Sequence, residues 1–189
     1  MANTEFEFQG VNHLALVCKD MARTVDFYSN LLGMPLIKTI ELPNGMGQHF
    51  FFDLGNGDSL AFFWFAHGPQ AAPGIASAAP GMLPGPSAHG SMNHVAINVP
   101  AEKIEEYYDK LRAKGIKASR VISHDDSPLQ ASLEITPTTF VRSIYFFDPD
   151  GIALEFAAWT RPLGTTADLA IKPAKAADKA RYLEPATAK

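Results

Sequence analysis

The sequence has only one cysteine, no long hydrophobic run and no excess of positive charge. A single cysteine, Cys18, excludes a disulfide within the chain and fits a reducing compartment, so we expect a cytoplasmic protein. Cys18 lies in an apolar strand pattern and is expected to be a small core residue rather than a nucleophile. No apolar run approaches the roughly 20 residues of a membrane span, and residues 1–7 lack the apolar core of a signal peptide. A net charge of −4 gives no reason to expect nucleic acid or a membrane as a partner, which leaves a small molecule.

The sequence contains enough hydrophobic residues for a core, and it contains an internal repeat. Of its 189 residues, 47% are hydrophobic, enough for one domain or for two small ones that share a sheet. Residues 11–17 and 92–99 both carry an Asn-His pair followed by apolar residues. Each is followed by a helical pattern that ends at a glycine, Gly33 or Gly115, 20 or 21 positions after the histidine. Strand patterns come next in both, so the sequence predicts two copies of a β-α-β-β-β module.

These modules set the expected domain boundaries. We expect the first module at residues 8–66 and the second at residues 91–160. Residues 67–90 between them are rich in Pro, Gly, Ala and Ser without a period, which is typical of a lid or a linker. Residues 161–189 are rich in Ala and Lys and are expected to form a partly helical or disordered C-terminal arm. The expected fold class is α+β, with two paired βαβββ modules forming a cupped mixed β-sheet and helices on the outside.

A predicted β-hairpin at residues 142–156 organises the second module. An aromatic and β-branched run enters it, Asp-Pro-Asp-Gly turns the chain at residues 148–151, and a second apolar run leaves. Glu155 lies within that second run, where a carboxylate is costly to bury unless a cation meets it. The alternative is that Glu155 faces solvent on an edge strand.

Strand parity places three chemically useful side chains on one face. In the first strand of each module, the residues that alternate with His13 or His94 face the helix, so both histidines point away from it. In the last strand Leu154 and Phe156 face the helix, and Glu155 points away. If the modules curl into a cup, the two histidines and the carboxylate line its concave face. Such a set favours Fe(II), or Mn(II), and leaves coordination positions open. The alternative for each histidine is an ordinary core or surface residue.

This arrangement resembles the vicinal oxygen chelate superfamily, which includes glyoxalase I, fosfomycin and bleomycin resistance proteins, methylmalonyl-CoA epimerase and type I extradiol dioxygenases. The likeness covers about residues 11–159. The resemblance implies metal ligands on the first and last strands of paired βαβββ modules, and His13, His94 and Glu155 fall on three of these positions. It also implies a dimer, so we expect a homodimer.

The fourth metal position separates the branches of that superfamily. Aligning residues 59–62 with residues 153–156 places Ala61 opposite Glu155. Glyoxalase I and the epimerase have Glu or Gln there, so the alanine makes this site resemble the three-ligand arrangement of the dioxygenases. The spacing of Tyr145, the Asp-Pro pair, the turn glycine and Glu155 also resembles the extradiol signature. This resemblance implies that Tyr145 bonds the substrate hydroxylate, and a buried core tyrosine is the alternative.

The sequence departs from the extradiol pattern at two histidines. Residues 136–139, before Tyr145, contain no histidine, and Asp58 stands where extradiol enzymes have a second histidine that acts as acid and base. Asp58 is the candidate to relay a proton, although its reference pKa of about 3.9 is far below the value of about 6.5 for histidine. Four other histidines are either substitutes or ordinary loop and surface residues, namely His49, His67, His89 and His124.

The expected function is that of a metal-dependent, extradiol-like dioxygenase that acts on a small aromatic or vicinal-oxygen substrate. Phe63, Asn98 and Ser143 are expected to contact the substrate. Two alternatives stay open. The first is a lyase, isomerase or epimerase in which the metal is a Lewis acid, with Ni(II) or Zn(II) as the preferred ion. The second is a non-catalytic protein that binds a planar or aromatic compound in a phenylalanine-rich cup.

Overall fold

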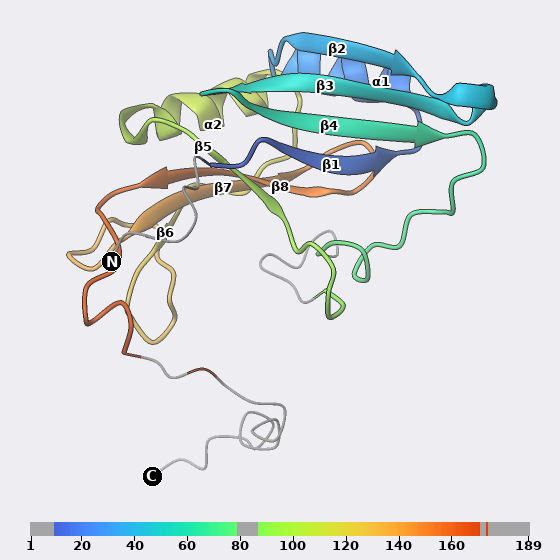
Figure 1. Ribbon diagram of the computed structural model, residues 1–189. Helices are drawn as coiled ribbons and strands as arrows, with labels where there is room; N and C mark the ends of the chain where they lie inside the picture. Colours follow the sequence, from blue (N-terminus) through green and yellow to red (C-terminus); the bar gives the residue numbers. More distant parts are fainter. Residues whose placement is uncertain (1–9, 79–86, 171–172, 174–189) are drawn as a thin grey trace.

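The computed structural model describes residues 10–78, 87–170 and 173. In this part of the chain the strands form two four-stranded mixed sheets, drawn as two layers in Figure 1. The first sheet has the order β1-β4-β3-β2 and the second the order β5-β8-β7-β6. The strands of the first sheet are β1 (His13–Cys18), β2 (Leu36–Glu41), β3 (Gly47–Gly55) and β4 (Asp58–Phe65). Those of the second sheet are β5 (Val95–Asn98), β6 (Ile122–His124), β7 (Val141–Phe147) and β8 (Ala153–Trp159).

Both sheets have the same connectivity, which confirms the α+β class and the two paired βαβββ modules. In each module the first strand pairs in parallel with the fourth, β1 with β4 and β5 with β8, and the remaining pairs are antiparallel. A helical segment connects the first and second strand in both. None of the described helices is long and apolar enough to cross a membrane.

The strand register establishes which positions of the two modules correspond. Ala15 pairs with Ala61 in the first sheet, and Ala96 pairs with Glu155 in the second. Ala15 and Ala96 each follow their module's histidine by two residues. The register therefore supports the alignment that places Ala61 opposite Glu155.

The helical segment of the first module begins at a side-chain cap and changes its hydrogen bonding after one turn. The Asp20 side chain accepts a hydrogen bond from the backbone N–H of Arg23, as its position before the helix predicts. The α-helix α1 (Met21–Val25) continues as the π-helix Asp26–Leu31, which buries Phe27 and Tyr28. Gly33 follows at φ 79°, in the left-handed conformation that ends many helices.

The second module differs from its predicted elements at two places. After Pro100 the chain forms a 3₁₀ turn, Ala101–Lys103, before the α-helix α2 (Ile104–Ala113). The strand pattern that follows Gly115 forms only the short strand β6, and Ala118 makes only an isolated bridge to Phe146. This shortening leaves residues 125–140 as a long connection between β6 and β7.

The helix-facing side chains of both modules form one hydrophobic core. They alternate along each strand with the residues of the opposite face, as parity predicts. Cys18 is a free, buried thiol in this core, and burial raises its pKa, which confirms its interpretation as a small core residue. The largest fully buried members are Tyr28, Phe52, Phe62, Phe146, Leu60, Ile104, Ile144 and Leu154.

The predicted Asp-Pro-Asp-Gly turn connects the two modules. Asp148 Oδ1 accepts hydrogen bonds from the backbone N–H groups of Asp150 and Ile152, which closes the turn. Asp148 Oδ2 accepts a hydrogen bond of 3.1 Å from the hydroxyl of Tyr28 in the first module. The backbone N–H of Lys19, directly after β1, donates to Asp150 Oδ2 over 2.8 Å. Burial is the main reason why the pKa of Asp148 is raised to about 6.

The predicted lid and arm are only partly described. Residues 79–86, in the middle of the predicted lid, lie outside the described residues. Before them Pro73 forms an isolated bridge with Ser77, and the backbone N–H of Ala78 donates to the carbonyl of Asn93. Of the predicted arm, residues 161–170 and 173 are described, and Arg161 forms an ion pair with Asp168.

Candidate functional site

Glu155 is buried in β8 and meets a cationic partner. Its side chain is nearly inaccessible, with a residue exposure of 5%. His94 Nε2 lies 2.9 Å from Glu155 Oε2, and the hydroxyl of Ser143 donates to Oε1 over 2.5 Å. Both carboxylate oxygens are therefore engaged. The alternative that Glu155 faces solvent on an edge strand does not hold, because β8 lies between β5 and β7.

The sheet register brings these side chains together. His94 directly precedes β5, and β5 runs parallel to β8 with Ala96 opposite Glu155. On the other side of β8, Tyr145 of β7 pairs with Glu155, and Ser143 pairs with Ala157. All these side chains leave the sheet on the face opposite the core residues Leu154 and Phe156, as strand alternation requires.

The carboxylate and the imidazole stabilise each other's charged form. The hydrogen bond to Glu155 raises the pKa of His94, against a smaller lowering by burial. Burial by itself raises the pKa of Glu155, but the hydrogen bonds from His94 and Ser143 more than offset it, so the pKa is lowered. Each member therefore favours the charged form of the other, and these contacts oppose the tendency of burial to neutralise Glu155.

Each module's histidine is oriented by the asparagine that precedes it. His94 Nδ1 lies 2.8 Å from Asn93 Oδ1, and His13 Nδ1 lies 2.7 Å from Asn12 Oδ1. A carbonyl acceptor at Nδ1 places the ring proton there, which leaves the Nε2 lone pair available when the ring is neutral. The Asn-His pair that marks the repeat in the sequence is therefore also a repeated structural unit.

Tyr145 borders the same site and is held by a histidine that precedes the hairpin. The hydroxyl of Tyr145 lies 3.0 Å from His124 Nε2, and His124 Nδ1 lies 3.2 Å from the carbonyl of Gln130. The tyrosine and His94 rings are 6.0 Å apart in an edge-on arrangement. Burial, and then the charge of Glu155, raise the pKa of Tyr145 to about 12, so it remains a phenol at neutral pH.

His124 contacts Tyr145 at this site, although sequence patterns did not single it out. It was one of four histidines without a predicted role, and the strand that it ends has only three residues. In the structure β6 pairs with β7, with His124 opposite Val141 on the strand that carries Tyr145. The signal that could have found it is its position on the strand next to the hairpin. The sequence does not fix that register, because 16 residues of connection separate the two strands.

His13 does not join His94 and Glu155 within one chain. Among the described residues, no three His, Cys, Asp or Glu side chains lie close enough together to hold one metal ion. His13 is exposed, and its ring lies 5.7 Å from that of Phe51 in its own sheet. Its neighbours on the same face of β1, Ala15 and Val17, are also exposed, the latter to 52%. The open face of the first sheet is thus uncovered along this edge strand.

The other residues predicted to act at the site are divided between the two sheets. Asp58 begins β4, and Phe63 stacks on His49 in the first sheet, with ring centroids 3.6 Å apart and planes inclined by 5°. Asn98 is exposed at the end of β5. Ser143, predicted to contact substrate, is fully buried and bonds Glu155 instead. The remaining histidines, His67 and His89, are exposed in the connection between the modules.

The pair His94–Glu155 fits a metal ion as two neighbouring ligands. Ligand atoms bonded to one ion at about 2.1 Å and at right angles are about 3 Å apart. The observed separation of Nε2 and Oε2 is 2.9 Å, and both are donor types that divalent transition metals accept. The oriented imidazole and the second hydrogen bond to the carboxylate are supports typical of metal ligands. The fit is that of a partial site, which requires at least one further donor.

Comparison with known proteins identifies the class to which this fold and site belong. Residues 10–156 match the Glyoxalase/Bleomycin resistance protein/Dioxygenase superfamily. Because this match spans most of the chain, the protein belongs to that superfamily, as the repeated modules predicted.

Solved structures agree with the family assignment at the level of the fold. The protein SMU.1112c is 24% identical with a TM-score of 0.57, over 80% of this chain and 99% of that one. A glyoxalase family protein from Enterococcus faecalis is 22% identical with a TM-score of 0.56, over 79% and 98%. The fosfomycin resistance protein FosX from Listeria monocytogenes, solved with Mn(II) and sulfate, is 20% identical with a TM-score of 0.50, over 87% and 100%. Identities this low show a shared fold alone.

Proposed function

We propose that this protein is a metal-dependent enzyme of the vicinal oxygen chelate type that acts on a small molecule with two neighbouring oxygens. The observation that carries the proposal is the buried pair His94–Glu155, with each member held by a further polar contact. Burying an ionised carboxylate and an imidazole costs free energy. An arrangement that also leaves both donors pointing to one place is better explained by a bound cation than by stability.

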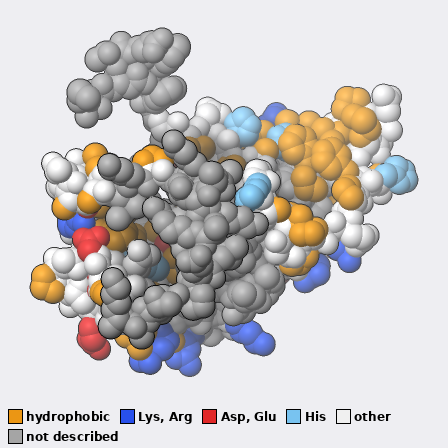
Figure 2. Space-filling model, turned by 90° about the horizontal axis from the view of Figure 1, so that it is seen from below, with side chains coloured by type: hydrophobic (Ala, Val, Ile, Leu, Met, Phe, Trp, Pro, Cys, Tyr) orange, Lys and Arg blue, Asp and Glu red, His pale blue; other side chains and the backbone are white. Residues whose placement is uncertain are grey.

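The third ligand in this proposal is the partner subunit's His13. Within a chain the open face of the first sheet is exposed along β1, where His13 lies. Hydrophobic side chains gather at one end of the molecule with histidines at their margin, as Figure 2 shows. An uncovered face of this kind is suited to a second copy of the chain. A homodimer then provides the two histidines and one carboxylate that favour Fe(II) or Mn(II).

We propose, more narrowly, an oxidoreductase of the extradiol dioxygenase type. A bound metal ion would supply positive charge that binds the substrate's oxygens as anions. Tyr145 would then donate a hydrogen bond to one of these oxygens, because its raised pKa keeps the proton on the phenol. His124 would orient that phenol, which supplies a histidine on the side of the site where this sequence lacks the histidine of the extradiol pattern. The single buried thiol, Cys18, supports a reducing cytoplasmic location.

Metal competition tests the proposal. The chain is purified without oxygen and offered Fe(II), Mn(II), Ni(II) and Zn(II) together, and bound ions are counted for the wild type and for Glu155→Ala. Glu106→Ala removes a carboxylate at an exposed position of α2 and is the matched control. We expect about one iron or manganese ion per chain in the wild type and in the control, and none in Glu155→Ala. In a second measurement, the metal-loaded wild type should take up oxygen with at least one member of a panel of catechols.

Two other results of the metal competition would replace the proposed function by an alternative. Nickel or zinc bound in preference, with hydrogen–deuterium exchange next to a carbonyl and no oxygen consumption, would replace the dioxygenase by a lyase or isomerase. Absence of bound metal from the wild type would overturn the enzyme proposal and favour a protein that only binds its ligand.

A further inference from the structure

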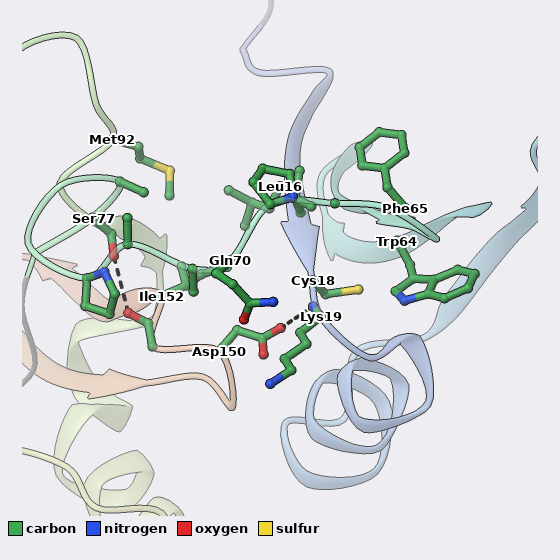
Figure 3. A pocket seen from close by; sticks show the side chains of 18 of the residues that line it. Leu16, Cys18, Lys19, Trp64, Phe65, Gln70, Ser77, Met92, Asp150 and Ile152 are labelled. Atoms are coloured by element: carbon green, nitrogen blue, oxygen red, sulfur yellow. Dashed lines mark hydrogen bonds between the residues drawn. The ribbon is translucent and has the colours of Figure 1, made fainter. Parts of the chain in front are cut away.

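A second candidate binding site lies where the two modules meet. A cavity of about 760 Å³ opens between the outer edge of β1, the segment that follows β4 and the turn between β7 and β8 (Figure 3). This volume is within the range of small-molecule sites. Neither His94 nor Glu155 lines the cavity, and neither does Tyr145. It is therefore distinct from the proposed ligands and does not rest on the proposed function, although Ala15 and Val17 of its lining belong to the face of β1 that is proposed to meet a second chain.

Hydrogen bonds between distant parts of the chain fix the walls of this cavity. The backbone N–H of Lys19 donates to Asp150 Oδ2 over 2.8 Å, which joins the end of β1 to the turn. The hydroxyl of Ser77 donates to the carbonyl of Gly151 over 3.2 Å, which joins the segment after β4 to the same turn. Figure 3 shows both bonds on the cavity wall. A cavity held in this way is present before a ligand arrives, so binding costs little ordering.

The lining determines the chemical class of the ligand. Most lining residues are apolar and small, and Trp64 and Phe65 contribute aromatic rings from the end of β4. The polar groups are few. The amide of Gln70 has no hydrogen-bond partner among the described residues, and it points toward the carboxylate of Asp150. Lys19 is the one cation and Asp150 the one anion of the described lining, so their formal charges sum to zero.

We propose that this cavity binds an uncharged, mainly apolar ring compound that carries one hydroxyl group. The ring packs against the small apolar residues and Trp64. The hydroxyl reaches the amide of Gln70 and donates to Asp150 Oδ1. Because the lining is apolar and its charges cancel, a carboxylate or an ammonium on the same ring gains no net attraction and loses its hydration.

The two tryptophans of the chain allow a direct test. Trp64 lines the cavity, whereas Trp159 is 54% exposed at the end of β8 and is not part of the lining. The probe is 4-tert-butylcyclohexanol, which does not absorb where tryptophan is excited. It is titrated into metal-free Trp159→Phe, in which Trp64 alone emits, and into Trp64→Phe, in which Trp159 alone emits. The matching carboxylate and ammonium compounds are titrated in the same way.

We expect a saturable change in Trp64 emission and none in Trp159 emission. Each charged analogue should bind at least about tenfold more weakly than the alcohol. Gln70→Ala should weaken the binding of the alcohol by about fivefold, the effect of one hydrogen bond. Ala76→Leu extends an exposed lining residue into the cavity and should abolish binding, whereas Ala22→Leu, on the exposed side of α1, should not change it.

Three outcomes would overturn this proposal. They are no saturable change at Trp64, equal binding by Ala76→Leu and the wild type, and equal or tighter binding of a charged analogue. Metal content separates the two proposals. Ala76→Leu should bind as much metal as the wild type, and Glu155→Ala should still bind the alcohol.

Discussion

At the scale of single residues, the repeated Asn-His pair is the most informative feature of this chain. Asn12 and Asn93 each hold Nδ1 of the next histidine, so both rings present Nε2 in the same manner. The repeat of this contact in both modules supports a common task for His13 and His94.

Removing either asparagine should weaken metal binding. Loss of the group that orients a ligating histidine typically lowers metal affinity by about 10- to 100-fold. We therefore expect Asn93→Ala and Asn12→Ala each to reduce the affinity for Mn(II) by at least about tenfold, measured by calorimetry. Asn98→Ala, at the exposed end of β5, is the control. An unchanged affinity in Asn12→Ala would remove His13 from the proposed ligand set.

The hydrogen bond between Tyr145 and His124 should be measurable as a coupling free energy. A buried side-chain hydrogen bond contributes about 1 kcal/mol to stability. In a double-mutant cycle of Tyr145→Phe and His124→Phe, urea denaturation should give a coupling of about that size. The same cycle with Tyr107→Phe, on α2, in place of the Tyr145 substitution should give no coupling. Coupling in neither cycle would show that the two side chains do not interact in solution.

Residue types and strand parity were sufficient to predict one half of the candidate site. A carboxylate in an apolar run, such as Glu155, was expected to need a cationic partner. His94, which corresponds to His13 in the first module, is that partner. Parity also placed Ser143 on the correct face, but it could not show that the serine bonds Glu155 rather than a substrate. Such details depend on rotamers, which sequence patterns do not determine.

At the scale of elements, the Asp-Pro-Asp-Gly turn does more than reverse the chain. The pattern predicted its conformation, and Asp148 does close it with two backbone hydrogen bonds. The same carboxylate accepts a hydrogen bond from Tyr28 in the other module. A local turn signal therefore coincides with a contact between modules that no local pattern reveals.

The burial of Asp148 at this turn predicts a pH dependence of stability. The pKa of Asp148 is about 6 in the folded chain, above its ordinary value of 3.8, because the carboxyl group is buried. Between these values the folded chain binds more protons than the unfolded chain, so the free energy of unfolding falls as the pH rises from about 4 to about 6. The full loss from this group corresponds to about 3 kcal/mol. Urea denaturation should show it in the wild type and not in Asp148→Asn.

Tyr28→Phe supplies an independent check of the same contact. The tyrosine hydroxyl stabilises the charged carboxylate, so its removal should raise the pKa of Asp148 further. The fall in stability should then extend to a higher pH than in the wild type. A pH profile identical to that of the wild type would show that the two modules are not joined through this bond.

Element boundaries were predicted less well than element types, for identifiable reasons. In the first module the helical stripe is real, but its second half is a π-helix in which the Leu32 N–H reaches back to the carbonyl of Phe27. An apolar stripe in the sequence does not distinguish an α-helix from a π-helix, in which each N–H bonds the carbonyl five residues back instead of four. In the second module β6 is short because only residues 122–124 pair with β7.

At the scale of the whole molecule, the arrangement of the two modules was the property that sequence could not supply. Parity correctly placed His13 and Glu155 on the faces opposite the helices. It gave no information on whether those faces meet within one chain. In the structure they do not, since no three suitable donors lie together among the described residues.

A mixing experiment decides whether two chains share each site. His13→Ala and Glu155→Ala should each bind no metal alone, because each dimer then lacks a ligand at both sites. If the chains are unfolded together and refolded in equal amounts, half of the dimers are mixed, and each mixed dimer has one complete site. We expect about a quarter of an ion per chain in the mixture. No metal in the mixture would place all ligands within one chain, and metal bound by His13→Ala alone would show that His13 is not a ligand.

The alanine at position 61 affects how many coordination positions of the proposed metal centre are left open by the protein. Its partner across the repeat is Glu155, so one module has a methyl group where the other has a carboxylate. In the proposed centre, Glu155, His94 and the partner's His13 would hold the ion and leave coordination positions open. These positions would accept both oxygens of a chelating substrate and one further small molecule. Ala61→Glu would add a protein ligand at one of these positions. The centre would then bind the chelating substrate without room for the further small molecule.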